Sequence, residues 1–162
     1  MAETPSTFSL TTGELAPGFI LPDVISGRSV RLFDRLGPRG TLVMFVCNHC
    51  PYVVLLADAL GRWGVEAATK GITTLAVNSN DAVNYPADSP EKMKEFAHAH
   101  EWEFPYLYDE TQEVARSFDA ACTPDFFLLD GKGRIFYTGQ FDFARPGNGK
   151  PVTGESMNKA LE

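Results

Sequence analysis

The chain has 162 residues, of which 44% are hydrophobic, so it is long enough to bury one core and too short for two ordinary domains. We therefore expect a single domain over residues 1–162. There are 14 Lys and Arg against 21 Asp and Glu, which gives a formal net charge of −7. This balance argues against nucleic acid and anionic membranes as partners, because both require clustered cations.

Residues 1–12 are polar and have neither the basic start nor the apolar core of a signal peptide. No apolar run in the chain reaches the length of a membrane span. We expect a flexible N-terminus, no membrane contact and a cytoplasmic location. In the cytoplasm a Cys-x-x-Cys pair is more often catalytic or metal-binding than a structural disulfide.

The first predicted element is a β-hairpin. Residues 13–22 alternate turn formers with apolar residues, and residues 23–32 repeat the pattern around Ser26-Gly27-Arg28. Residues 34–40 are a loop because of their Gly and Pro content. Residues 41–46 form a short apolar run, which predicts a buried central strand.

Cys47-Asn48-His49-Cys50 follows this strand and leads into a helical pattern. Pro51 is tolerated in a first helical turn, and apolar residues then recur at helical spacing until residues 70–71. Gly61 and Gly64 are unfavourable inside this helix, each by roughly 1 kcal/mol relative to Ala. We expect the strand to deliver both thiols to the helix N-terminus, with Cys50 one turn further in and more buried.

The spacing of the two cysteines suits a reversible dithiol/disulfide pair. The thiolate is the nucleophile, and the positive end of a helix favours the charged form of Cys47. Cys50 would then attack a mixed disulfide formed at Cys47. An imidazolium at His49 would lower the thiol pKa further and make the disulfide a stronger oxidant. Structural zinc usually takes two such pairs, whereas this chain has three cysteines and three histidines.

The second half of the chain continues the α/β pattern. Residues 72–77 are apolar and β-branched, which predicts a strand parallel to the first and joined to it by a right-handed crossover. After a polar loop, Ser89-Pro90-Glu91 marks a helix start. His98 and His100 lie on this charged helix as solvated or half-buried residues, and we assign them no chemistry.

The remaining elements follow from short apolar runs and turn residues. An edge segment is expected at 104–108, a short helix at 110–118, strands of a hairpin at 126–129 and 135–138, a loop at 139–151 and a terminal helix at 153–161 capped by Thr153.

This order of elements, with a Thr-Pro before the second hairpin, resembles the thioredoxin-like superfamily. It is most similar to the peroxiredoxin-like and thiol–disulfide oxidoreductase branch, which includes alkyl hydroperoxide reductase and thiol-specific antioxidant proteins. The resemblance covers nearly the whole chain. It implies an α/β fold with a central mixed sheet flanked by helices, an N-terminal β-hairpin and an insertion around residues 78–104.

The resemblance also implies roles for individual residues. Cys47 is similar to the attacking cysteine of the family and Cys50 to the resolving one. Pro124 resembles the cis-proline that the family places against its dithiol. A cis bond there would expose the backbone of Thr123, which could pair with an extended substrate segment.

The chain departs from its relatives close to the motif. His49 matches the histidine of the Cys-Pro-His-Cys motif in bacterial disulfide oxidases, but Asn48 replaces its proline. The predicted central strand lacks the aspartate usual in thioredoxin, which leaves the second thiol without an obvious buried base. If Cys50 is the cysteine of the peroxiredoxin signature Pro-x-x-x-Thr-x-x-Cys, Cys47 replaces its Thr and Val43 its Pro.

Cys122 lies two positions before Pro124 and is therefore expected near the pair. It is either a buried apolar cysteine, a possible third redox thiol, or a soft metal ligand.

We expect a thiol–disulfide oxidoreductase that uses Cys47 and Cys50 on a protein or small-molecule thiol or disulfide. An unidentified electron donor serves it, and no cofactor is implied. The alternatives are a thiol peroxidase and a copper or zinc module through Cys47, Cys50 and either His49 or Cys122.

Overall fold

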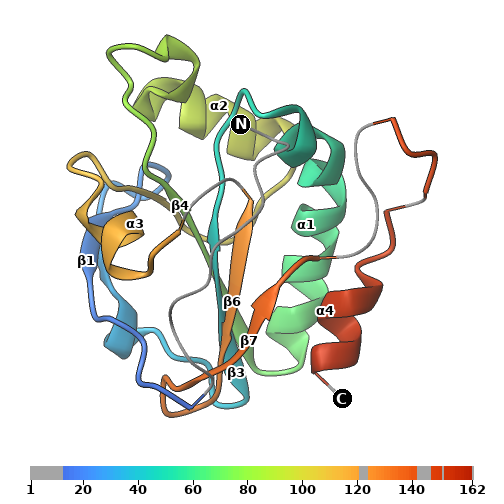
Figure 1. Cartoon of the computed structure of the whole chain (residues 1–162). Helices are drawn as coiled ribbons and strands as arrows, with labels where there is room; N and C mark the ends of the chain where they lie inside the picture. The colour runs from blue at the N-terminus through green and yellow to red at the C-terminus, as the bar shows by residue number, and fades with distance from the viewer. Residues whose placement is uncertain (1–12, 121–123, 142–146, 151, 162) are drawn as a thin grey trace.

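The computed structural model describes residues 13–120, 124–141, 147–150 and 152–161 of the chain (Figure 1). The N-terminal residues 1–12, Cys122 and Thr123 lie outside the described residues. Within these ranges, no helix is long and apolar enough to cross a membrane.

A five-stranded mixed sheet forms the centre of the molecule. In spatial order its strands are β5 (Tyr106–Tyr108), β4 (Ile72–Asn78), β3 (Gly40–Phe45), β6 (Asp125–Leu129) and β7 (Ile135–Gly139). β3 pairs parallel with β4 and antiparallel with β6. β3 is therefore the central strand, as the sequence predicts, and all of its residues are buried.

Alternate residues of β3 face two separate cores, because successive side chains of a strand point to opposite faces of the sheet. Leu42 and Met44 pack into one hydrophobic cluster, and Val43 and Phe45 pack into the other. A strand buried on both faces needs an uninterrupted apolar sequence, which explains the run at residues 41–46.

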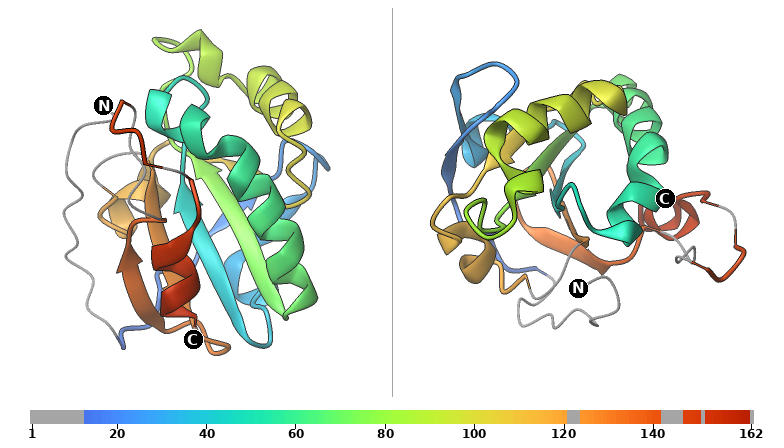
Figure 2. Two further views of the ribbon diagram at one scale, coloured as in Figure 1. Left: turned by 90° about the vertical axis from the view of Figure 1, so that its right-hand side faces the viewer. Right: turned by 90° about the horizontal axis from the view of Figure 1, so that it is seen from above.

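The two faces of the sheet are covered by different elements (Figures 1 and 2). The elements of the first core are α1 (Pro51–Thr69), α2 (Pro90–Ala99) and α4 (Glu155–Ala160). Those of the second core are α3 (Glu113–Ser117) and the antiparallel pair of β1 (Ile20–Pro22) and β2 (Ser29–Arg31). The expected thioredoxin-like architecture, with its N-terminal hairpin and its insertion between β4 and β5, is thus confirmed.

The two glycines of α1 do not interrupt this helix of 19 residues. A Cβ atom on Gly61 would lie 2.6 Å from the backbone oxygen of His100, and one on Gly64 would lie 2.6 Å from the ring of Phe104. Both contacts are closer than real Cβ atoms allow, so a larger residue would push α1 away from the chain that follows α2. The glycines cost helix propensity and permit this close packing.

Two helix boundaries differ from the prediction. The terminal helix begins at Glu155 after Gly154, whose φ of 72° makes it the N-cap in place of Thr153. The helix expected at 110–118 is shorter, because Gln112 is left-handed with φ of 66°. Here the Asp109 carboxylate accepts from the backbone N–H groups of the first helical turn.

Candidate active site

Both thiols lie in the connection between β3 and α1. Cys47 and Cys50 are each 1% exposed, lie about 4.5 Å apart and are not joined in a disulfide. A disulfide requires a sulfur–sulfur distance of about 2.05 Å, so the connection must move before the bond can close.

The position of Cys50 corrects one expectation. Cys50 is the N-cap of α1 and does not lie one turn inside it, and it is no more buried than Cys47. The reason is Pro51, the first helical residue, because a proline disfavours helical dihedrals at the residue before it. Cys50 accordingly has φ −70° and ψ 121°. Cys47 lies three residues before this N-cap and therefore outside α1, so its neighbours include groups from other elements.

Asp88, from the insertion, is the residue that organises the motif. Its side chain is completely buried. One carboxylate oxygen accepts from the Asn48 backbone N–H (2.6 Å) and Asn78 Nδ2 (3.1 Å). The other lies 2.5 Å from His49 Nδ1 and accepts from Asn80 Nδ2 (3.1 Å). A carboxylate has about four lone-pair sites, so these four contacts satisfy the buried group.

Tyr106 extends this network beneath the motif. Its hydroxyl donates to Asn48 Oδ1 (2.8 Å) and accepts from Asn78 Nδ2 (3.3 Å). Burial raises the pKa of the Tyr106 phenol well above its ordinary value of 10.0; the hydrogen bond from Asn78 opposes this shift, and the charges of Asp88 and Cys47 add to it. The phenol therefore keeps its proton and its role as a donor.

The imidazole of His49 is held on two sides. Its Nδ1 meets Asp88, and its face stacks on Tyr85 with ring centroids 5.0 Å apart and an interplanar angle of 2°. A ring nitrogen of His49, the sulfur of Cys47 and an oxygen of Asp88 all lie within 4.8 Å of one another. The His49 side chain is 32% exposed, so the ring lies between the buried network and solvent.

Local turn chemistry places Asp88. A 3₁₀ turn, η2 (Pro86–Asp88), starts at a proline whose fixed φ suits a first helical position. The backbone N–H of Asp88 bonds to Tyr85 O (2.9 Å), and that of Ser89 bonds to Pro86 O (3.2 Å). Ser89 is then the N-cap of α2 and accepts from the Lys92 backbone N–H, as the sequence predicts. The carboxylate is thus fixed between two consecutive turns.

The same residues bear on the metal alternative. Cys47, His49 and Asp88 offer sulfur, nitrogen and oxygen ligands within 4.8 Å, a set that suits zinc. However, all four acceptor sites of Asp88 are already used. A metal bound to this carboxylate would have to displace at least one donor. The side chains therefore fit a hydrogen-bonded network better than a preformed metal centre.

Pro124 leads into β6 and is buried. The next residue, Asp125, is completely buried and pairs with Phe45, two residues before Cys47. This register brings the start of β6 alongside the end of β3 and supports the expected place of Pro124 near the dithiol. The isomer of the Thr123–Pro124 bond and the role of Cys122 stay predictions.

Sequence reasoning missed Asp88, Tyr85 and Tyr106. No short pattern marks them, because their contacts join residues about 40 to 60 positions apart. The one available signal was the place of the insertion, directly after the carboxyl end of a parallel strand, where α/β sheets tend to bind ligands.

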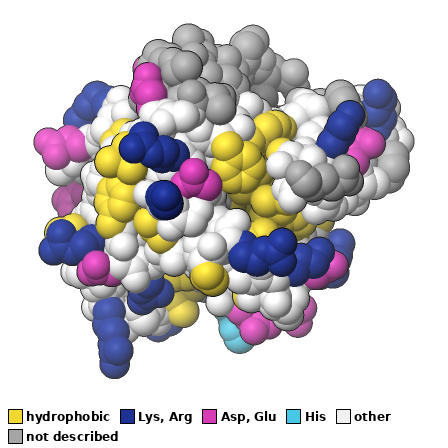
Figure 3. Space-filling model, turned by 90° about the horizontal axis from the view of Figure 1, so that it is seen from below, with side chains coloured by type: hydrophobic (Ala, Val, Ile, Leu, Met, Phe, Trp, Pro, Cys, Tyr) yellow, Lys and Arg dark blue, Asp and Glu magenta, His cyan; other side chains and the backbone are white. Residues whose placement is uncertain are grey.

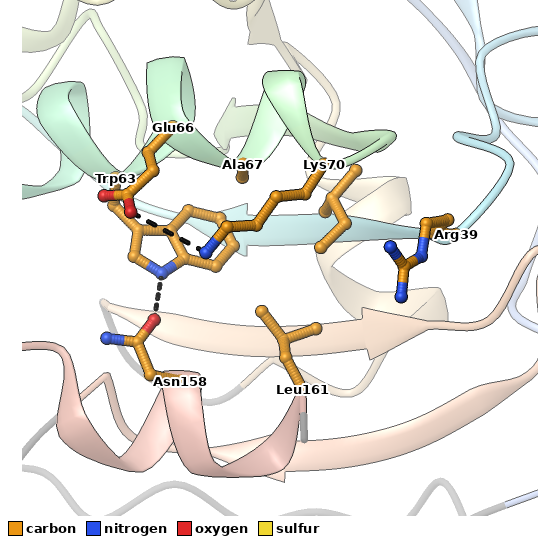
Figure 4. A pocket seen from close by; sticks show the side chains of 8 residues that line it. Arg39, Trp63, Glu66, Ala67, Lys70, Asn158 and Leu161 are labelled. Atoms are coloured by element: carbon orange, nitrogen blue, oxygen red, sulfur yellow. Dashed lines mark hydrogen bonds and ion pairs between the residues drawn. The ribbon is translucent and has the colours of Figure 1, made fainter.

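The opposite end of the sheet holds a separate cavity of about 360 Å³ (Figure 4). Trp63 Nε1 donates to Asn158 Oδ1 (2.9 Å) there, and Lys70 pairs with Glu66 (3.6 Å). Hydrophobic side chains border Lys and Arg side chains on this end of the molecule (Figure 3). None of the described residues that line the cavity is a cysteine or histidine, so it is not part of the dithiol site.

Comparison with solved structures places the fold. An uncharacterized conserved protein from Geobacillus kaustophilus is 49% identical, with a TM-score of 0.93, over 98% of this chain and 85% of that chain. A hypothetical protein from Sinorhizobium meliloti 1021 is 42% identical, with a TM-score of 0.91, over 96% and 84%. The thioredoxin domain of a thiol-disulfide oxidoreductase from Bacteroides vulgatus has a TM-score of 0.70 at 20% identity, over 95% and 100%. The chain has a thioredoxin-like fold.

Sequence comparison identifies the branch. Residues 12–138 match the AhpC/TSA family, and the chain belongs to this family. A curated relative from Mycobacterium tuberculosis, named "Putative peroxiredoxin", is 30% identical over 118 residues, which are 70% of this chain and 67% of the relative. The family and the structural neighbours together indicate a thiol-dependent redox enzyme.

The raised pKa of Tyr106 predicts a pH dependence of stability. Below pH 10 the phenol is protonated in both states; above it the unfolded chain loses the proton while the folded chain keeps it, so the free energy of unfolding falls as pH rises. In urea unfolding between pH 8 and about 11, Tyr106→Phe should flatten this fall. Burial also raises the pKa of Tyr108 and Tyr137, so part of the slope will stay.

Tyr85→Phe is the matched control, because the Tyr85 side chain is half exposed. If Tyr85→Phe flattens the fall as much as Tyr106→Phe does, the effect does not come from the buried phenol. Equal slopes for wild type and Tyr106→Phe would show that the Tyr106 phenol is not protected from ionisation.

Proposed function

We propose that the protein is a thiol–disulfide oxidoreductase in which Cys47 and Cys50 alternate between dithiol and disulfide. The observation that carries this proposal is the pair of thiols about 4.5 Å apart at the end of β3 and the N-cap of α1. The Cys47 thiolate attacks a substrate disulfide, forms a mixed disulfide and releases one substrate thiolate. Cys50 then attacks the Cys47 sulfur, releases the second substrate thiolate and closes the Cys47–Cys50 bond.

This reaction transfers two electrons from the dithiol to the substrate, and an external thiol donor must return them. The direction of net transfer depends on the reduction potential of the pair against that of its compartment. In a reducing compartment such as the cytoplasm the pair would act as a disulfide reductant. The substrate is a protein or small-molecule disulfide, and the backbone beside Pro124 is the expected contact for an extended segment.

We assign the attack to Cys47 because a ring nitrogen of His49 lies within 4.8 Å of its sulfur. Both cysteines are 1% exposed, so a substrate reaches the sulfur only when the connection between β3 and α1 opens locally. Cys50, held at the N-cap beside Pro51, is the better placed of the two to stay in position and resolve the mixed disulfide.

Single cysteine variants test these roles. Cys47→Ser should abolish exchange with an oxidised glutathione or insulin substrate, because no mixed disulfide can form. Cys50→Ser should accumulate the mixed disulfide at Cys47, detectable by intact-mass spectrometry, because the resolving thiol is absent. In the wild-type protein Cys47 should be alkylated before Cys50 at neutral pH.

Cys122→Ser should exchange at the wild-type rate if Cys122 is a buried apolar cysteine, whereas a loss of exchange would make it a third redox thiol. If Cys47→Ser traps the substrate and Cys50→Ser is inactive, the two roles are reversed.

A thiol peroxidase is the second candidate, because the chain belongs to the AhpC/TSA family and is similar to a protein named as a peroxiredoxin. Cys50 at the N-cap of a long helix is also suited to carry a thiolate. Such a thiolate would attack a peroxide oxygen, become a sulfenic acid and release water or an alcohol. The neighbouring thiol would then condense with the sulfenic acid to a disulfide and release water.

We rank peroxide reduction below disulfide exchange because the peroxiredoxin signature is substituted in this chain. The Thr and Pro of that signature, which hold the peroxide and shield the site, correspond here to Cys47 and Val43. We therefore predict that purified protein with a matched reductant consumes hydrogen peroxide far more slowly than a dedicated peroxiredoxin assayed in parallel. Consumption at the rate of that peroxiredoxin would reverse the ranking and make Cys50 the peroxidatic residue.

A further inference from the structure

We propose that Asp88 is a positioning residue of the dithiol site: it holds His49 in the Nδ1–H tautomer, so that Nε2 accepts the thiol proton of Cys47. The inference rests on the proposed thiol–disulfide exchange. It gives the insertion between β4 and β5 a part in the chemistry.

The hydrogen bonds of Asp88 favour one tautomer of His49. The other three partners of the carboxylate are N–H groups that only donate, so it accepts at both oxygens, and an Nδ1–H of His49 completes this set at the 2.5 Å contact. In neutral imidazole the other nitrogen, Nε2, is then the acceptor. Stacking on Tyr85 restrains the ring in this orientation. His49 therefore presents a defined proton acceptor at the edge of the site.

The same carboxylate also fixes the segment that carries the nucleophile. The backbone N–H of Asn48 donates to Asp88, so the peptide directly after Cys47 and the ring of His49 are held by one group. Asn78 and Asn80 anchor that group to the end of β4. A ring nitrogen of His49 lies within 4.8 Å of the Cys47 sulfur, so a residue about 40 positions away in sequence holds the thiol and the imidazole at this spacing.

The exchange step then balances as follows. The proton of the Cys47 thiol moves to His49 Nε2, and Asp88 stabilises the imidazolium that results. The Cys47 thiolate attacks the substrate disulfide, and the departing substrate thiolate takes the proton from His49. Asp88 thus provides a buried carboxylate beside the dithiol, which the central strand β3 does not contain.

Asp88→Asn tests the proposal. The amide nitrogen would face His49 Nδ1 or the Asn48 N–H, because the asparagine side chain offers one accepting oxygen where the carboxylate offers two. We expect His49 to change toward the Nε2–H tautomer, read from the nitrogen-15 shifts of its ring by NMR. The exchange rate should fall about 100-fold, the low end of what general acid–base catalysis contributes.

Asp109→Asn is the matched control. Asp109 is also buried and accepts from Ser79 Oγ (2.6 Å) and from backbone N–H groups of α3, but among the described residues it makes no hydrogen bond to the motif. It should lose stability as Asp88→Asn does, while the His49 tautomer and the exchange rate stay those of the wild type. Equal losses of exchange rate in Asp88→Asn and Asp109→Asn would show that Asp88 has only a structural role.

A double-mutant cycle separates action through His49 from a general effect. In a His49→Ala background, Asp88→Asn should lose most of its 100-fold effect, because only its hydrogen bond to the Asn48 backbone N–H is left to act. A further 100-fold loss there would overturn the proposal. The wild-type protein gives an independent test that needs no variant to fold, because an Nε2–H tautomer in its NMR spectrum would also overturn it.

The outcomes for the proposed function are distinct. If the wild-type protein exchanges no disulfide, the proposed function fails, whereas the tautomer still tests Asp88. If exchange is normal and unaffected by Asp88→Asn, the proposed function stands and the role of Asp88 fails.

Discussion

The structure around the motif depends on one buried carboxylate. Asp88 is completely removed from solvent and is satisfied by four donors, two of them from the Cys-Asn-His-Cys segment. A buried charge that loses its partners costs several kcal/mol, so the insertion and the motif must keep their relative positions for the chain to fold stably. The thiols, the imidazole and the insertion are therefore one structural unit, joined by hydrogen bonds and not by sequence proximity.

The parts of this unit meet at one end of the sheet, where β3 and β4 finish. β3 and β4 run parallel, so the motif after β3 and Asn78 at the end of β4 emerge side by side. The insertion starts at this end of the sheet and leads to β5, whose first residue, Tyr106, donates a hydrogen bond to Asn48 of the motif. The antiparallel β6 begins at the same end with Asp125. Ligand sites of α/β proteins lie at the carboxyl ends of their parallel strands, and the dithiol follows this rule.

Local patterns in the sequence predicted the elements, while contacts across the chain decided the details of the site. The uninterrupted apolar run of β3 and the Ser-Pro start of α2 are local signals, and both were correct. The glycines of α1 could not be interpreted from sequence, because their role is contact with His100 and Phe104. The cysteine spacing predicts Cys50 inside the helix, whereas Pro51 makes it the N-cap, an effect of proline on the preceding residue that the sequence alone also predicts. Asp88 resembled an ordinary residue of a polar loop until the fold brought it to His49.

The central claim is that Cys47 and Cys50 form a reversible redox pair. The most direct measurement is a titration of the purified protein against glutathione buffers, followed by intact-mass spectrometry under native conditions. We expect a single two-electron transition, in which the protein loses two hydrogen atoms and regains them on reduction. Cys47→Ser and Cys50→Ser should show no such transition. A stable metal adduct in place of the disulfide, or oxidation that adds oxygen without linking the two thiols, would contradict it.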